Sequence, residues 1–264
     1  MSNGDPVCTV IGKQPLISVV MPCFNAASYI EEAVRSVLDQ TYQTVELIIV
    51  DDGSTDESPA IVAKLIELSN GRIIYTRQSN AGPYAARNHG LQLASGAFIA
   101  FLDADDWWRH DCLEKLLAAL HEDPNCALAY CGWQKVGSVG GAEIPYVPPD
   151  YEQEDKVARF LLAASPWPIH AALVRRTVLD KVGGFDLDYP TCMDYDLWLR
   201  VAASHPIRLV PEVLAFYRQH QSGQITSTQW RQARNTWLVK RKFIRENPGL
   251  VSHLSRSQLR DLVD

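Results

Sequence analysis

The stretch FIAFLDADDWW (residues 98–108) decides how this sequence folds, because an apolar run leads directly into three aspartates within four positions. Carboxylates this close repel one another, and apolar surroundings make each of them harder to ionise. A divalent cation offsets such repulsion, since hard cations favour carboxylate oxygens. The alternative is a solvated acidic turn whose aspartates cap the helix that follows. The place of the stretch in the fold distinguishes the two.

Short apolar runs alternate with helical segments through the first half of the chain. The runs are rich in β-branched residues, which is typical of buried strands. In the helical segments apolar residues recur every three or four positions, and Ser28 and Glu31 form the pattern of a capping box at the first one. The predicted strands are residues 16–22, 45–50, 72–77 and 97–102, and the predicted helices are residues 28–39, 58–69, 83–94 and 111–122.

This alternation predicts an α/β fold in which a mostly parallel, Rossmann-like sheet carries helices on both faces. Right-handed crossovers place the carboxyl end of every parallel strand at one edge of the sheet, where ligands bind. Asn25 follows the first strand, the DDGSTD segment (residues 51–56) follows the second, and the DADD segment (residues 103–106) follows the fourth. We therefore expect these polar groups to converge on one site.

The composition excludes several classes of protein. The 264 residues carry a formal net charge of −6 and are 47% hydrophobic, which is typical of a globular chain and argues against nucleic-acid binding. Six scattered cysteines without a CxxC pair favour a reducing, cytoplasmic location. The first residues lack signal-peptide order, and no apolar run approaches the roughly 20 residues of a membrane span. GxxxxGK[ST] and strand-linked GxGxxG motifs are absent.

The second half of the chain is less regular and is expected to form a different pocket. It begins near residue 127, and no internal repeat interrupts it. The predicted strands are residues 127–136, 170–176 and 209–220, the predicted helices are residues 178–186 and 194–204, and residues 137–150 are a predicted loop.

The DDGSTD segment has an ordinary and a functional interpretation. The ordinary one is an Asp-Gly turn before a helix, with Thr55 or Asp56 near the cap. The functional one is a nucleoside site, where a carboxylate accepts hydrogen bonds from a base N–H or from ribose hydroxyls. A nucleotide ligand combines this contact with a diphosphate that a metal at residues 103–106 would bind.

Four segments together resemble the family 2 glycosyltransferases, in the same order and at fitting spacings over about residues 16–222. The resemblance implies the GT-A fold and inverting transfer of a sugar, UDP-linked by default, from a nucleotide donor to a carbohydrate or lipid-linked acceptor. The segments are VVMPCFNAASYIEEAVRSVLDQTY, VELIIVDDGSTD, NAGPYAARNHGLQLASGAFIAFLDADD and GGFD…DYDLWLRVA…FYRQH.

With this resemblance we divide the chain into a flexible leader (residues 1–14), one GT-A domain and a helical tail (residues 223–264). The domain then has a nucleotide-binding half (residues 15–126) and an acceptor half (residues 127–222). The sequence gives no indication of oligomeric state.

The resemblance also implies a set of donor-binding residues. Asp52 matches the aspartate that holds the uracil or the ribose, and Asn25 with the backbone around Pro22 lines the same pocket. Arg87 stands where the family often has a basic residue facing the donor, although a surface arginine on a helix is an equal alternative. Asp103 belongs to the donor and metal motif.

The metal and the catalytic base are implied in the same way. Asp103 and Asp105 match the DxD motif that binds Mn²⁺ or Mg²⁺, and His220 matches a late histidine that returns to the metal. Asp194 matches the catalytic base, and the N-terminal dipole of its helix favours its anion. The family commonly has Glu-Asp here, whereas this chain has Met193, so any role of that glutamate is in doubt.

Aromatic residues and the tail complete the predictions. One of Trp107 and Trp108 is expected in the core and the other against a sugar face, and Trp167 is a candidate for the acceptor cleft. Residues 229–245 are basic with interspersed aromatics, which indicates either a helix packed on the domain or peripheral contact with an anionic membrane. The alternative functions are a nucleotidyltransferase and a catalytically disabled binding module.

Overall fold

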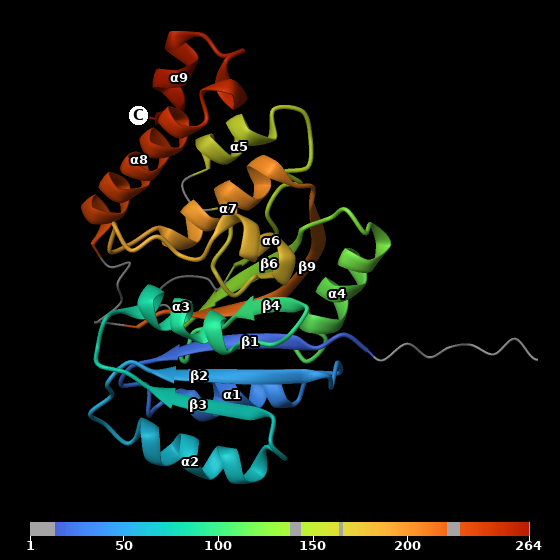
Figure 1. Ribbon diagram of the computed structural model, residues 1–264, viewed down its shortest axis with the longest axis vertical. Helices are drawn as coiled ribbons and strands as arrows, with labels where there is room; N and C mark the ends of the chain where they lie inside the picture. The colour runs from blue at the N-terminus through green and yellow to red at the C-terminus, as the bar shows by residue number, and fades with distance from the viewer. Residues whose placement is uncertain (1–13, 138–143, 164–165, 221–227, 264) are drawn as a thin grey trace, which may run out of the picture.

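A computed structural model describes residues 14–137, 144–163, 166–220 and 228–263 (Figure 1). The leader predicted over residues 1–14 lies outside the described residues, except for Gln14. The strands are β1 (Ile17–Cys23), β2 (Val45–Asp51), β3 (Ile73–Arg77), β4 (Phe98–Phe101), β5 (Trp107–Trp108), β6 (Leu128–Val136), β7 (Pro145–Tyr146), β8 (Ala172–Arg175) and β9 (Ile207–Arg218). The helices are α1 (Ile30–Leu38), α2 (Ser58–Leu68), α3 (Pro83–Leu93), α4 (Cys112–Glu122), α5 (Lys156–Leu162), α6 (Arg176–Val182), α7 (Met193–Ser204), α8 (Gln229–Glu246) and α9 (Arg256–Val263), with a 3₁₀ turn, η2, at Pro248–Val251.

The described strands form one sheet in the order β3-β2-β1-β4-β8-β6-β9-β5, with β7 paired to β6. Strands β3, β2, β1 and β4 are parallel neighbours, which confirms the prediction made from the alternation. The chain adds β2 and β3 on one side of β1 and then returns to place β4 on the other side. Helix α3 consequently covers the opposite face of the sheet from α1 (Figure 1). The carboxyl ends of β1 and β4 meet at this reversal, which is where α/β sheets bind ligands.

The second half of the sheet mixes strand directions. Strand β8 is antiparallel to both β4 and β6, β6 and β9 are parallel, and β5 is antiparallel to β9. The sheet is nevertheless mostly parallel, because only β5, β7 and β8 among the described strands run against the rest. The loop predicted over residues 137–150 contains the short strand β7, and residues 138–143 lie outside the described residues.

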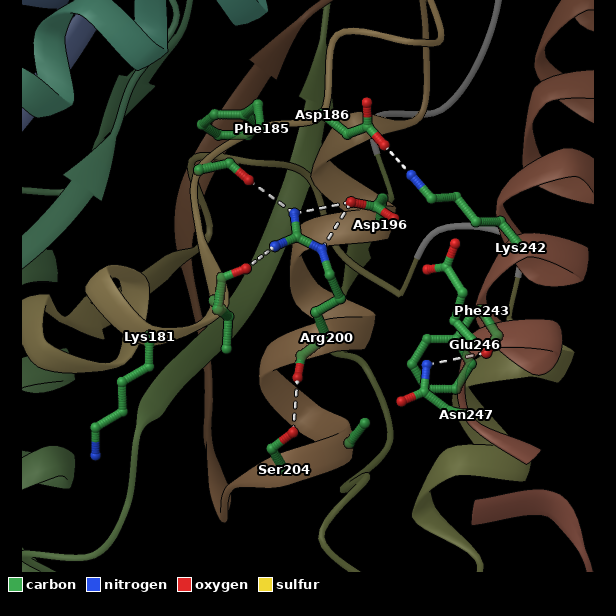
Figure 2. A pocket seen from close by; sticks show the side chains of 13 residues that line it. Lys181, Phe185, Asp186, Asp196, Arg200, Ser204, Lys242, Phe243, Glu246 and Asn247 are labelled. Atoms are coloured by element: carbon green, nitrogen blue, oxygen red, sulfur yellow. Dashed lines mark hydrogen bonds and ion pairs between the residues drawn. The ribbon is translucent and has the colours of Figure 1, made fainter. Parts of the chain in front are cut away.

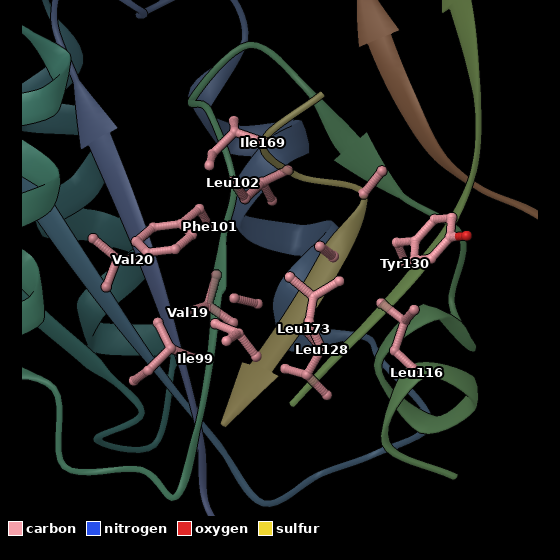
Figure 3. Packing of buried hydrophobic residues seen from close by; sticks show 14 of the residues in the cluster. Val19, Val20, Ile99, Phe101, Leu102, Leu116, Leu128, Tyr130, Ile169 and Leu173 are labelled. Atoms are coloured by element: carbon pink, nitrogen blue, oxygen red, sulfur yellow. The ribbon is translucent and has the colours of Figure 1, made fainter. Parts of the chain in front are cut away.

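Buried side chains of the two halves form one continuous core. Val20 of β1, Phe101 of β4 and Leu173 of β8 are all fully buried, and they lie in the same cluster (Figure 3). Helix α3 approaches β1 closely at Gly90, where an added Cβ would overlap the side chain of Val20. This contact fixes the position of α3, and therefore of Arg87, against the sheet.

The capping box predicted at the first helix is wrong. Helix α1 begins at Ile30 with Tyr29 as its N-cap, and no side chain caps it. The carboxylate of Glu31 instead accepts hydrogen bonds from Arg35, one turn later on the same helix. The reason is that residues 26–29 already form a turn, with the N–H of Tyr29 donating to the carbonyl of Ala26 at 2.9 Å.

Candidate active site

Hydrogen bonds tie together the loops that follow β1 and β2 at the carboxyl edge of the sheet. The side-chain oxygen of Asn25 accepts the N–H of Thr55 at 2.8 Å, and the N–H of Asn25 donates to Ser54 Oγ at 3.0 Å. Asn25 has φ 50°, a left-handed conformation that asparagine tolerates better than most residues. Pro22, the last residue but one of β1, is buried. The predicted neighbours Asn25 and residues 51–56 are thus in direct contact.

Asp52 holds the loop that leads into α3. One carboxylate oxygen accepts Gln78 Nε2 at 2.8 Å and the N–H of Ala81 at 2.9 Å, and the other accepts the N–H of Gly82 at 2.8 Å. The residue is only 2% exposed. Each carboxylate oxygen has two acceptor sites, so Oδ2 retains capacity for one further donor. Contact between Asp52 and a nucleoside stays a prediction, while its support of the 78–82 loop is directly visible.

Arg87 is the basic group at the centre of the site. It projects from α3, is 4% exposed, and forms an ion pair with Asp103. Its guanidinium lies 5.3 Å from the ring centre of Tyr84 and 5.7 Å from that of Phe185. Burial lowers the pKa of Arg87, but the carboxylate of Asp103 outweighs this and keeps the group charged. The interpretation of Arg87 as a surface arginine is therefore wrong.

Asp194 lies in the first turn of α7, where Cys192 caps the helix in a left-handed conformation, φ 68°. Burial raises the pKa of Asp194, and the N–H of Tyr195, 2.9 Å from Oδ1, and the charge of Arg87 oppose the rise. The negative charge of Asp103 raises this pKa further. The arrangement places a carboxylate with elevated proton affinity beside the Arg87–Asp103 pair.

Asp196, two residues after Asp194 on α7, belongs to another environment. Its carboxylate accepts Arg200 Nε at 2.9 Å, and Arg200 also donates to the carbonyls of Val182 and Gly184 at 2.6 and 2.8 Å. These residues line a groove of about 550 Å³ between α6, α7 and α8 (Figure 2). Asp196 is thus engaged in holding the 182–184 turn.

The three aspartates after β4 each have a different partner. Asp103 pairs with Arg87, as described above. Asp105 Oδ2 lies 2.6 Å from Nε2 of His220, a residue that follows β9 in the sequence. Asp106 is 1% exposed, with Oδ2 3.1 Å from Nδ1 of the fully buried His170.

Asp106 also fastens the end of β9 to this turn, since its Oδ1 accepts the N–H of Arg218 at 2.8 Å. Burial raises the pKa of Asp106 to about 6, while His170 opposes the rise. Asp106 therefore supports the end of β9, and it does not cap α4, whose N-cap is Asp111.

The predicted metal ligands are only partly assembled. Asp105 and His220 face each other, whereas Asp103 is turned to Arg87. Among the described residues, no group of three His, Cys, Asp or Glu side chains is close enough to hold a metal ion. A carboxylate and an imidazole nevertheless form a donor set that suits a borderline cation such as Mn²⁺ once their direct 2.6 Å contact opens.

The sequence did not single out several residues around the site. Tyr84 and Phe185 pack on Arg87, and His170 balances the charge of Asp106. A lone aromatic or histidine in an irregular segment carries no periodic signal, so only the GGFD motif around Phe185 offered a hint. Arg218, at the end of β9, donates to the carbonyl of Asp105 at 2.9 Å.

The three tryptophans named as candidates differ in their burial. Trp108 is 3% exposed and donates to the carbonyl of His170 at 2.7 Å, so it is the core member of its pair. Trp107 is half-buried and stacks on Phe216 with ring centres 5.4 Å apart. The prediction that Trp167 lines an acceptor cleft is wrong, because it is 1% exposed and stacks on Tyr130 at 4.1 Å.

These features define an α/β protein with an acidic, arginine-containing site at the carboxyl edge of its sheet. The family model "Glycosyl transferase family 2" matches residues 18–183, and the chain belongs to this family. It is therefore a glycosyltransferase of the GT-A fold, as the resemblance implied.

Two curated relatives illustrate the similarity. The "Putative teichuronic acid biosynthesis glycosyltransferase TuaG" of Bacillus subtilis (strain 168) is 31% identical over 238 residues, covering 88% of this chain and 90% of the relative. An uncharacterized glycosyltransferase of Haemophilus influenzae is 47% identical over 103 residues, or 39% of this chain and 41% of that protein.

Solved structures share the fold at lower identity. S. aureus TarS in complex with UDP-GlcNAc superposes with a TM-score of 0.71 at 21% identity, covering 94% of this chain and 70% of that one. The mannosyltransferase PcManGT of Pyrobaculum calidifontis, in complex with GDP-Man and Mn²⁺, gives 0.69 at 22% identity, covering 95% and 74%. Among the described residues, no helix has the length and apolar character required to cross a membrane.

Proposed function

We propose that this glycosyltransferase transfers a sugar from a UDP-linked donor to an acceptor hydroxyl with inversion at the anomeric carbon, in the synthesis of a polysaccharide or glycoconjugate. The observation that carries the proposal is the position of Asp194 beside the Arg87–Asp103 pair, with a pKa that burial raises. The naming of TuaG for teichuronic acid biosynthesis and the UDP-GlcNAc complex of TarS support the product class and the donor class.

The donor lies, in this proposal, at the carboxyl edge of the sheet. The loops at Pro22, Asn25 and Asp52 form the nucleoside side, because they are bonded together beside the ends of β1 and β2. Asp103 takes part in both donor and metal binding. Arg87 holds Asp103 in place and offers the buried positive charge nearest to the leaving diphosphate.

A divalent cation, with Mn²⁺ favoured over Mg²⁺ by the imidazole, is assigned to Asp105 and His220 together with Asp103. When bound, such an ion neutralises charge on the departing nucleoside diphosphate. The chain supplies the orientation of these ligands. Arg218 donates to the carbonyl of Asp105, and Asp106 is buried against His170. These contacts fix the turn that carries Asp103 and Asp105.

Asp194 acts as the general base in this proposal. Its carboxylate takes the proton of the acceptor hydroxyl as the hydroxyl oxygen bonds to the anomeric carbon, while the bond from that carbon to the phosphate oxygen breaks on the opposite face. An elevated pKa suits this task, because a base is most effective when its pKa lies near the working pH. Met193, in place of the family glutamate, is fully buried and offers no contact to an acceptor.

Two substitutions test the assignments by calorimetry and by release of UDP from UDP-GlcNAc. Asp105→Ala should remove the dependence of UDP affinity on Mn²⁺, and Asp194→Asn should retain donor binding while UDP release falls about 10²–10⁴-fold. Asp188→Asn, an exposed carboxylate in the same segment, should change neither quantity.

A separate result would contradict each of the two assignments. If Mn²⁺ does not alter UDP affinity in the unmodified protein, the metal site is wrong. If Asp194→Asn releases UDP at the unmodified rate, the base is another residue.

A further inference from the structure

Helix α8 presents one continuous face of arginine and tryptophan to solvent. Successive residues of a helix are about 100° apart, so Trp230, Arg234, Trp237, Arg241 and Arg245 fall on the same side. Trp230 is 67% exposed, which is unusual for so large an apolar side chain. The arginines of this face are all exposed. We call these five residues the Arg/Trp face.

The charges of this face are not balanced by the rest of the protein. Within the described residues, no carboxylate lies within ion-pair distance of Arg234 or Arg241, and Arg245 meets only Glu246, at 3.5 Å. The guanidinium of Arg241 lies instead 4.5 Å from the ring centre of Trp237. This cationic surface occurs on a chain whose net charge is −6, so it is a local concentration of positive charge.

The opposite side of α8 is firmly attached to the domain. Val239 and Phe243 are buried in the main core, and Lys242 forms an ion pair with Asp186 at the groove drawn in Figure 2. Lys240 is 8% exposed and donates to the carbonyl of Leu262 at 3.0 Å. The Arg/Trp face is consequently a rigid surface of the domain.

The first turns of α8 also contact the segment that carries the proposed base. Asn235 Nδ2 donates to Thr191 Oγ1 at 2.7 Å, and Cys192 Sγ lies 3.0 Å from the side-chain oxygen of Gln232. Since Cys192 is the N-cap of α7, two residues before Asp194, α8 is joined directly to the segment that carries the proposed base.

We infer that the Arg/Trp face docks on the surface of a bilayer that contains anionic lipids. Arginines attract anionic headgroups, and tryptophan prefers the boundary between headgroups and acyl chains. An acidic polymer would use the arginines but gives no reason for an exposed Trp230 beside them. Docking through α8 would hold the attached segment that carries the proposed base close to the membrane, where a lipid-linked acceptor is presented. The inference concerns a surface separate from the donor site, so it can fail without the proposed function failing.

Sedimentation with vesicles tests the inference on the full chain. The protein should bind vesicles of phosphatidylcholine mixed with phosphatidylglycerol, and bind phosphatidylcholine alone far more weakly. Raising the salt from about 0.1 M to 1 M shortens the Debye length from about 10 Å to 3 Å and should release the protein. The double variant Arg234→Gln/Arg241→Gln should bind roughly thirtyfold more weakly, because each surface arginine contributes roughly five- to sixfold.

Matched variants separate docking from general effects. Arg35→Gln/Lys64→Gln removes the same charge from exposed positions on α1 and α2 and should bind the anionic vesicles as the unmodified chain does. Trp230→Ala should weaken binding without altering its dependence on salt. UDP affinity should be the same in all these variants, because none of the substituted residues lies at the donor site.

Two results would overturn the inference. One is equal binding of Arg234→Gln/Arg241→Gln and the control to anionic vesicles. The other is a dimer in sedimentation equilibrium that Trp230→Ala dissociates, since a second copy of the chain would then be the occupant of the face.

Discussion

Replacing Arg87 by Met tests whether this arginine balances the charge of the site. Met retains much of the length and the apolar contacts of arginine against Tyr84 and Phe185. It removes the positive charge that faces Asp103, while the burial of that carboxylate stays almost the same. The variant therefore isolates the electrostatic contribution of Arg87 from its contribution to packing.

The magnitude follows from the burial of the pair. Removing one partner of a buried ion pair costs about 3–5 kcal/mol, because the other charge is left without compensation. The side chain of Arg87 is 5% exposed but that of Asp103 is 29% exposed, so water screens part of the loss. We take the lower end, about 3 kcal/mol, which lowers the Tm of a chain of this size by roughly 6–12 °C.

Thermal unfolding of Arg87→Met and the unmodified chain measures this fall in Tm. A chelator is added so that no metal ion compensates the charge of Asp103. Arg35→Met is the matched control, because its ion pair with Glu31 is exposed and such pairs contribute about 0.3–0.5 kcal/mol. Its Tm should fall by no more than about 2 °C. Equal Tm values for the two variants would refute the view that Arg87 compensates the acidic site.

Three further predictions concern the base and the position of α3. Because burial raises the pKa of Asp194, activity should be lost as the pH falls through a pKa above the usual aspartate value. The raised pKa also means that ionisation of Asp194 opposes folding, so Asp194→Asn should have a higher Tm than the unmodified chain at pH 7. Thermal melts at several pH values should show that this difference disappears below the aspartate pKa of the unfolded chain. Gly90→Ala should lower the free energy of unfolding in urea by about 1–3 kcal/mol through overlap with β1, whereas Gly249→Ala, which meets no neighbouring atom, should change it little. Asn88→Ala removes two 2.8 Å hydrogen bonds to the backbone of Phe185 and should cost about 1–3 kcal/mol for each group left unpaired, measured in the same urea experiment.

The parallel half of the sheet could be predicted because its signals are local. Each strand from β1 to β4 is an apolar run with a helix after it, and crossover handedness then fixes the arrangement. The position of β8 could not be predicted in this way. Its pairing of Val174 with Ile99 joins residues far apart in sequence, so an apolar run identifies the strand but not its neighbours. The start of α1 at Ile30 shows the same limit, because a local turn overrode the capping pattern.

The site was predictable in its acidic members, and the resemblance also named Arg87 and His220, but the pairing of each with its aspartate and the role of His170 were not predicted. Asp103 and Asp105 follow a buried strand, so their location at the sheet edge follows from the fold. The burial of Arg87 depends on the close contact of α3 with β1 at Gly90, which no periodicity records. Trp167 was placed wrongly because a single aromatic residue between prolines gives no information on the direction of its side chain.

The partners of the acidic turn explain how an apolar strand can end in three aspartates. A different element supplies the partner of each aspartate: α3 provides Arg87, the segment before β8 provides His170, and the segment after β9 provides His220. The buried Asp106–His170 pair fixes the turn, whereas the other two pairs are partly exposed, at 29% for Asp103 and 35% for Asp105. A bound cation would compete with Arg87 for Asp103 and would bind between Asp105 and His220 in place of their direct contact, and it would leave the buried pair in place. Folding without ligand and binding of a metal–diphosphate complex thus draw on the same negative charges, which is why the turn tolerates so many of them.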